Sequence, residues 1–248
     1  MALVNSFETS GNFLFKHRGQ IPVILFIMAV PVIFFTDISK LNDWQIYFLN
    51  ISAIALSVFG FIFRAYAIGS TPKGTSGRNT QNQVAESLNT TGIYSIVRHP
   101  LYVGNYFMWI GIVLFTYNVY YVTIVSLMFW LYYERIMYAE ERFLERKFGE
   151  TYLKWTENIP AFIPSFKFAK KSEVPFSLKT VLRREYAGVL ATVFGFAFVD
   201  YLRFYLIEEL NGSLLRPSLH ILVLTGVATV ILRTLKHNTT LLNQTDRS

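Results

Sequence analysis

The chain has 248 residues, of which 52% are hydrophobic and 17% aromatic, and its formal net charge is +7. With a mean hydropathy of +0.35, this composition excludes an ordinary soluble domain and is typical of one domain embedded in a bilayer. Because the chain has no cysteine, disulfides, thiolate metal sites and a cysteine nucleophile are excluded, and we expect no metal site. The positive charge fits anionic lipid headgroups better than nucleic acid, for which no binding module is visible.

Six apolar stretches predict an all-α, polytopic integral membrane protein with about six transmembrane helices. Four stretches approach the roughly 20 residues that cross a bilayer, and two are shorter and are predicted to be thin or tilted spans. In chain order the six stretches are 21–35, 44–63, 101–120, 121–138, 187–207 and 219–232.

Lysine and arginine are concentrated in alternate connecting segments: before the first span, between the second and third, and between the fourth and fifth. The positive-inside rule places these segments and both termini in the cytoplasm. The two long polar segments then face the cytosol. The absence of retention signals and the shortness of the chain favour the plasma (inner) membrane of a prokaryote.

The same pattern divides the chain into three parts. Residues 1–68 form an N-terminal transmembrane hairpin, and residues 69–171 form a core with two transmembrane helices and the cytosolic segments. Residues 172–248 form a C-terminal transmembrane hairpin of unknown role. Charges in it such as Glu185 and Asp200 are either functional or, as the commoner explanation, interfacial charges at the ends of spans.

The polar segment 69–91 is rich in Gly, Ser, Thr, Asn and Gln, which predicts a loop. It is either a hydrophilic connector or a flap over a ligand, in which Arg78 would meet an anion.

An Arg-His-Pro triplet, Arg98 to Pro100, precedes the third predicted span. Proline is favoured in the first turn of a helix, where no backbone donor is lost, so Pro100 predicts where that helix starts. Arg98 and His99 would then stand beside unpaired backbone N–H groups at the positive end of the helix dipole, which suits a carboxylate or phosphate. Alternatively, the triplet only anchors the helix to headgroups, and Tyr102 belongs to an interfacial aromatic belt.

A second group of candidate residues lies in the segment 138–164, which is predicted to continue the fourth span as a charged helix. At 100° per residue, Glu141 falls within an apolar stripe, where a carboxylate is costly unless it is paired. Glu141 is therefore the stronger functional candidate, and Glu140 lies at the edge of the stripe. The structural alternative is an ion pair from Glu141 to Arg98 or Arg64.

Two blocks of residues in this order and spacing cover about residues 88–166. They are Thr91-Gly92 with Tyr94, Arg98-His99-Pro100 with Tyr102 and Gly104, then Glu140-Glu141, Phe148-Gly149 with Tyr152, and Ile159-Pro160 with Pro164. In this pattern the chain resembles the isoprenylcysteine carboxyl methyltransferase and phospholipid methyltransferase family. The chain departs from the family at Trp155 and at Ala161-Phe162, positions close to a possible lipid entrance.

The resemblance implies an S-adenosylmethionine-dependent methyltransferase that acts on a membrane lipid or lipid-modified substrate. Arg98 and Glu141 are the candidate catalytic residues. The candidate cofactor-binding residues are Tyr94, Arg98, His99, Pro100, Tyr102, Gly104, Glu140 and Glu141. Arg98 or Arg64 could orient an anionic acceptor, and the excess of arginine favours O-methylation of a carboxylate or phosphate over methylation of an amine.

Three acceptors stay open: a prenylcysteine carboxylate, a lipid phosphate and a phospholipid amine. Two other functions also stay open. The first is an NADPH-dependent reductase that resembles the membrane sterol reductases in helical layout, and the second is a non-catalytic membrane protein.

Overall fold

The computed structural model describes residues 2–20, 22–75, 83, 85–206 and 215–244. Arg78 and the predicted span ends Ile21 and Ile207 lie outside these residues. The described residues are all-helical, with one isolated antiparallel bridge between Gly92 and Lys170 and no strand. The α-helices are α1 (Leu3–Lys16), α2 (Val23–Phe34), α3 (Asp43–Gly69), α4 (Pro100–Leu114), α5 (Val119–Phe148), α6 (Glu150–Thr156), α7 (Leu178–Leu206) and α8 (Pro217–Asn238). Short 3-10 turns, η1 (Ile38–Lys40), η2 (Ile93–Ser95) and η3 (Phe166–Phe168), lie between them.

Three of these helices, α3, α7 and α8, are long and apolar enough to cross a membrane by length and composition. Two more, α2 and α4, are apolar but shorter. The helical fold class is confirmed, and the number of six spans stays a prediction.

Two predicted span boundaries are wrong. The stretch predicted as 101–120 ends as a helix at Leu114, because Tyr117 adopts a positive φ of 61° and Asn118 caps the next helix by accepting from the Tyr121 N–H. The helix of the stretch predicted to begin at residue 187 begins at Leu178 instead, and two charged residues of its first turns, Arg184 and Glu185, are buried and not in solvent.

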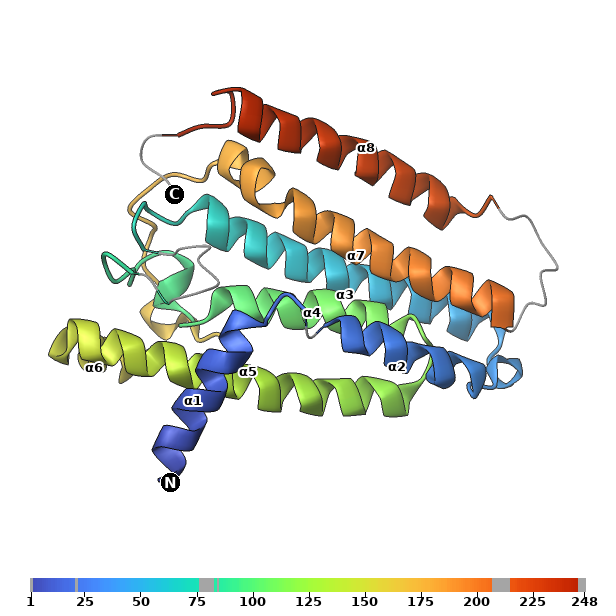
Figure 1. Cartoon of the computed structure of the whole chain (residues 1–248), viewed down its shortest axis with the longest axis horizontal. Coiled ribbons are helices and arrows are strands. Elements are labelled where there is room, and N and C mark those ends of the chain that lie inside the picture. Colours follow the sequence, from blue (N-terminus) through green and yellow to red (C-terminus); the bar gives the residue numbers. More distant parts are fainter. Residues whose placement is uncertain (1, 21, 76–82, 84, 207–214, 245–248) are drawn as a thin grey trace.

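Helices α2, α3, α4, α5, α7 and α8 run alongside one another in a bundle, with α8 outermost against α7 and α1 crossing the end of α5 (Figure 1). Helices α3 and α4 pack most closely. Their backbones approach where glycines face each other: a Cβ at Gly60 would stand 2.7 Å from the Met108 nitrogen, and one at Gly104 would stand 2.8 Å from the Gly60 oxygen. Small residues at these positions thus allow the backbones of α3 and α4 to approach closely.

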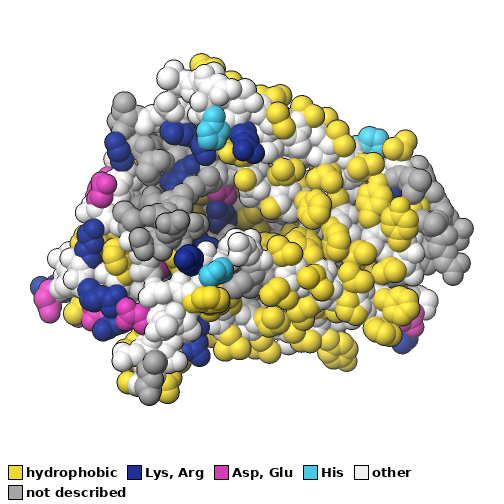
Figure 2. Space-filling model, viewed as in Figure 1, with side chains coloured by type: hydrophobic (Ala, Val, Ile, Leu, Met, Phe, Trp, Pro, Cys, Tyr) yellow, Lys and Arg dark blue, Asp and Glu magenta, His cyan; other side chains and the backbone are white. Residues whose placement is uncertain are grey.

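Charged side chains gather at one end of the molecule, where α1, η2 and the start of α7 meet (Figure 2). Hydrophobic side chains cover the visible face of the rest of the bundle (Figure 2). Helix α8, for example, leaves Val223 and Val230 more than half exposed and has no buried residue. This division into a charged end and an apolar body is typical of an integral membrane protein, because lipid covers the apolar side chains.

Candidate active site

A cavity of about 420 Å³ opens at the charged end of the bundle. Its wall combines the end of α1 with parts of α3, η2, α4, α5 and α7. Besides three tyrosines, its ionisable lining residues are four arginines, two glutamates and one histidine. These seven are Arg18, Arg64, Arg98, His99, Glu140, Arg184 and Glu185. The cavity therefore has an excess of positive charge and attracts anions.

Two features fix the position of the Arg-His-Pro triplet. One is the start of α4, and the other is the segment at Pro160 and Ala161, near the end of the second sequence block. Pro100 is the first residue of α4, as predicted. The backbone N–H groups of Arg98 and His99 donate to the carbonyls of Pro160 and Ala161, at 2.9 and 3.1 Å. The Ile-Pro end of the second block thus holds the triplet in place.

Most backbone N–H groups of the expected cradle are paired. The triplet's own donors are bonded to residues 160 and 161, and Pro100 has no N–H. The N–H groups of Tyr102 and Val103 turn back to the His99 carbonyl, at 3.1 and 3.3 Å. Leu101, which lines the cavity, is the residue of this first turn whose N–H makes no such bond, so side chains would supply most of the contacts to a ligand here.

His99 lies between the two glutamates of α5. Its Nε2 is 3.0 Å from Glu141 Oε1, and its Nδ1 is 3.4 Å from Glu140 Oε2. Arg98 approaches the same Glu141 oxygen at 3.2 Å, and the Tyr102 hydroxyl donates to Glu140 at 2.7 Å. The ion pair from Glu141 to Arg98 is confirmed.

In this cluster the neighbouring opposite charges stabilise the ionised forms of His99 and Glu141. Burial lowers the pKa of His99, but the carboxylates of Glu140 and Glu141 outweigh burial and leave that pKa raised. Burial also raises the pKa of Glu141, but the His99 and Arg98 cations outweigh it and leave that pKa lowered. A protonated His99 between two carboxylates is the arrangement that these shifts favour.

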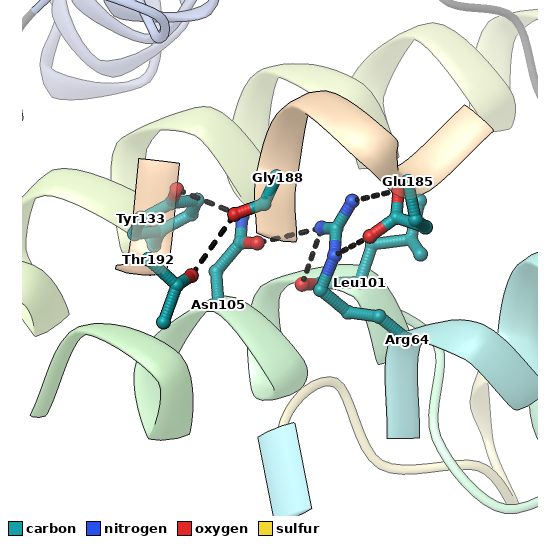
Figure 3. A network of polar contacts seen from close by, with 7 residues as sticks. All are labelled: Arg64, Leu101, Asn105, Tyr133, Glu185, Gly188 and Thr192. Atoms are coloured by element: carbon teal, nitrogen blue, oxygen red, sulfur yellow. Dashed lines mark hydrogen bonds and ion pairs between the residues drawn. The ribbon is translucent and has the colours of Figure 1, made fainter. Parts of the chain in front are cut away.

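The floor of the cavity is a second network, built by residues of four helices (Figure 3). Arg64 of α3 donates from Nε and Nη2 to the two oxygens of Glu185 of α7, at 2.8 and 2.7 Å. Its Nη1 donates to Asn105 Oδ1 of α4 at 2.6 Å, and the Asn105 amide donates to the Tyr133 hydroxyl of α5 at 3.1 Å. The alternative pairing of Glu141 with Arg64 is therefore wrong, because Glu185 occupies the guanidinium.

Six of the eight predicted cofactor-binding residues line the cavity: Tyr94, Arg98, His99, Pro100, Tyr102 and Glu140. Two are not among the lining residues. Glu141 stands behind His99 and Arg98, and Gly104 leaves the space through which the Arg64 side chain passes. A Cβ at residue 104 would overlap the Arg64 Cγ and lie 3.2 Å from its Cδ.

Tyr94 lies between the two polar clusters. Burial is the main cause that raises its pKa to about 12, and the charges of Arg184, Glu140 and Arg64 all act on its phenol. The hydroxyl therefore stays protonated at neutral pH, and it is within hydrogen-bond reach of the Thr71 side chain.

Several lining residues were not predicted, namely Arg18, Asn105, Tyr133, Arg184 and Glu185. The interpretation of Glu185 as an interfacial charge is wrong, since its side chain is only 2% exposed and is paired with Arg64. A signal was available: Arg184 and Glu185 adjoin an apolar span, where ionisable groups are rare and functional.

Fold and site together define a helical membrane protein with a cationic cavity at its charged end. Residues 46–151 match the family model described as phospholipid methyltransferase. The resemblance that the motifs indicate is confirmed.

Curated relatives agree with this assignment. The chain is 30% identical over 128 residues to the protein-S-isoprenylcysteine O-methyltransferase of Xenopus laevis, covering 51% of this chain and 44% of the relative. It is 30% identical over 120 residues to the protein of the same name from Schizosaccharomyces pombe, covering 46% and 50%. A nickel-cobalt-cadmium resistance protein, NccN of Alcaligenes xylosoxydans xylosoxydans, is 27% identical over 153 residues, covering 62% and 67%.

The chain thus spans about half the length of the isoprenylcysteine methyltransferases that it matches. No solved structure gave a significant match.

Proposed function

We propose that this protein is a membrane methyltransferase that transfers the methyl group of S-adenosylmethionine to a carboxylate or phosphate oxygen of a lipid or lipid-modified substrate. The observation that carries the proposal is the convergence of both family motifs on one cationic cavity, through the contact of His99 with Glu140 and Glu141. The relatives' name supports a lipidated acceptor.

The lining residues fit the cofactor in size and charge. A cavity of about 420 Å³ is within the range of small-ligand sites. S-adenosylmethionine carries an ammonium, ribose hydroxyls and a carboxylate, which need an acceptor and a cation. Glu140 offers a carboxylate on the wall, and Arg98 offers a guanidinium whose buried Nε has no hydrogen-bond partner among the described residues.

We assign roles on this basis. Glu140 accepts hydrogen bonds from the ammonium or ribose, and Arg98 binds the carboxylate of the cofactor. Glu141 positions His99 and Arg98, because both cations converge on its Oε1 atom. Arg98 and Glu141 would thus act on the cofactor side of the reaction centre.

The cofactor, when bound, supplies an electrophilic methyl group on a sulfonium. Glu140 and Arg98 would hold the cofactor while an acceptor oxygen would bond to this carbon, and the electrons of the broken carbon–sulfur bond would pass to sulfur. A carboxylate or phosphate is already ionised at neutral pH, so the protein needs no general base. Its task is to align the reactants and exclude water.

We also propose that the charged end of the bundle faces the cytosol, with both termini there and the protein in a prokaryotic plasma membrane. The alternation of basic connecting segments supports this orientation.

The experiment that tests the function is calorimetric titration of the detergent-solubilised protein with S-adenosylhomocysteine, with NADPH as a parallel ligand. We expect saturable binding of S-adenosylhomocysteine and none of NADPH. Binding of NADPH alone would contradict the proposed methyltransferase function and would favour a reductase. With binding established, methyl transfer from radiolabelled cofactor to isoprenylcysteine, phosphatidic acid and phosphatidylethanolamine identifies the acceptor class.

A further inference from the structure

The connection between α6 and α7 contains a segment, residues 163–177, that we call the strap. In Figure 1 it belongs to the yellow-orange coil at the end of the bundle where charged side chains gather. Hydrogen bonds hold both of its ends. The Ser165 N–H donates to the Ile96 carbonyl at 2.8 Å, and the Ser177 N–H donates to the Gly69 carbonyl at 2.9 Å. The strap is therefore attached to the bundle at two points.

The strap begins and ends close to the boundary of the membrane. Gly69 is the last residue of α3, and Ser177 directly precedes Leu178, the first residue of α7. Both helices are long and apolar enough to cross a membrane. Because the bond from Ser177 to Gly69 joins the ends of two such helices, the strap lies where lipid meets water.

The outward side chains of the strap are both apolar and cationic. Ile163 and Phe166 are 76% and 73% exposed. Three exposed lysines follow them within a few residues, against one acidic residue in the strap, Glu173. These lysines are Lys167, Lys170 and Lys171. Within the described part of the chain, no ion pair neutralises them.

An anionic lipid complements both kinds of side chain. Its phosphate attracts the ammonium groups, and its acyl chains cover the phenyl ring of Phe166 and the side chain of Ile163. A soluble anion would meet only the lysines, and it would leave the apolar side chains in water. The position of the strap at the end of two spans favours the lipid further.

We propose that the strap is a binding surface for anionic lipids of the membrane in which the protein lies. Lys167, Lys170 and Lys171 bind the headgroup phosphates, and Ile163 and Phe166 insert beside the acyl chains. The proposal concerns a binding partner, and it does not depend on the proposed methyl transfer.

The strap also connects this surface to the wall of the cavity. The Lys170 N–H donates to Ser95 Oγ at 2.8 Å, and Ser165 bonds to Ile96. Both partners directly follow Tyr94, which lines the cavity. A lipid bound to the strap therefore stabilises this wall, and anionic lipid should raise the melting temperature.

The test measures lipid binding to the full-length protein in a neutral detergent. Phosphatidylglycerol and phosphatidylcholine with identical acyl chains are titrated, and bound lipid is counted by native mass spectrometry. The double variant Lys167→Gln/Lys171→Gln is compared with Lys147→Gln/Lys154→Gln, which removes two exposed lysines of α5 and α6 outside the strap. Thermal unfolding without added lipid checks that each variant is folded.

We expect the wild type to bind phosphatidylglycerol about tenfold tighter than phosphatidylcholine, and to melt at a higher temperature with phosphatidylglycerol. A lysine near an anionic surface contributes a roughly fivefold gain in affinity. Lys167→Gln/Lys171→Gln should thus lose most of the preference, and the control variant should keep it. Phe166→Ser should weaken the binding of both lipids and leave their ratio unchanged.

Three results would overturn the proposal. Equal affinity of the wild type for the two lipids would do so, and would favour an acidic protein as the partner of the strap. Equal losses in the two double variants would show that total charge, not the strap, determines the preference. Displacement of phosphatidylglycerol by an equal concentration of glycerol 3-phosphate would show that the ligand is a soluble phosphate and not a lipid surface.

Discussion

The Nε2 atom of His99, the residue that caps α4, lies 3.0 Å from Oε1 of Glu141 near the end of α5. This contact joins the two sequence blocks through two residues that are 42 positions apart in the chain. It also brings Arg98 to the same carboxylate, at 3.2 Å. The charged extension of α5 is thereby fastened to the start of α4, and the wall of the cavity depends on this junction.

The junction predicts a pH window. The pKa of His99 is raised from 6.5, so the stabilisation from its charge is complete below about pH 6.5 and is lost as the pH rises through the raised value. The pKa of Glu141 is lowered from 4.5, so its contribution is complete above about pH 4.5 and is lost as the pH falls through the lowered value.

We therefore expect the affinity for S-adenosylhomocysteine to be highest between these values and to fall on the alkaline side as His99 deprotonates. Titration calorimetry across pH measures it. His99→Asn should remove the alkaline decline, and an identical decline in that variant contradicts the assignment.

Glu140 should contribute more to cofactor binding than any other carboxylate of α5, because it alone of that helix's glutamates lines the cavity. Loss of a hydrogen bond to a charged group costs about 1.5–3 kcal/mol. Glu140→Gln should thus weaken S-adenosylhomocysteine binding by roughly ten- to hundredfold. Glu145→Gln is the matched control, since Glu145 pairs with Arg142 away from the cavity. Equal effects of the two substitutions would refute the role of Glu140.

Gly104→Ala should disturb the floor network. The added Cβ would overlap the Arg64 side chain and press on the Gly60 carbonyl at 2.8 Å. Overpacking of this kind costs about 1–3 kcal/mol, so the melting temperature in detergent should fall. Gly226→Ala is the control, because a Cβ added there would have nothing within 4 Å. A Gly104→Ala protein as stable as the wild type would show that Arg64 can move aside freely.

The far end of α7 offers a stability prediction that is separate from the site. Asp200 accepts from Nε and Nη2 of Arg216, at 2.9 and 3.0 Å, and from the Ser218 hydroxyl at 2.6 Å, which holds the start of α8 against α7. Asp200→Asn should lower the melting temperature, because the partly exposed Arg216 and the buried Arg203, which lies 3.5 Å from Asp200 Oδ1, both lose a carboxylate.

The same substitution should leave S-adenosylhomocysteine affinity unchanged, because residue 200 is roughly 22 Å along the helix from residue 185. Thermal unfolding and calorimetry on one preparation measure both quantities. A large loss of affinity would mean that the two ends of α7 are coupled.

The helical membrane class, the start of α4 at Pro100 and the two motif blocks could all be predicted from the sequence alone. These features follow from local physics, because apolar length sets a span and proline sets a first turn. Helical projection also singled out Glu141 as a carboxylate that needs a partner, and its pairing with Arg98 is confirmed.

Three other features depend on packing between helices and appear only in the tertiary structure. They are the carboxylate that lines the cavity, the space that Gly104 leaves for the Arg64 side chain, and the contribution of α7 to the cavity wall. Glu140 and Glu141 are adjacent in sequence, and their different surroundings depend on how α4 packs against α5. Gly104 contacts Arg64, 40 residues earlier in the chain, and Glu185 reaches the same guanidinium from 121 residues away. Contacts between helices that are distant in sequence have no local signature, because any face of an apolar helix can be buried against protein or lipid.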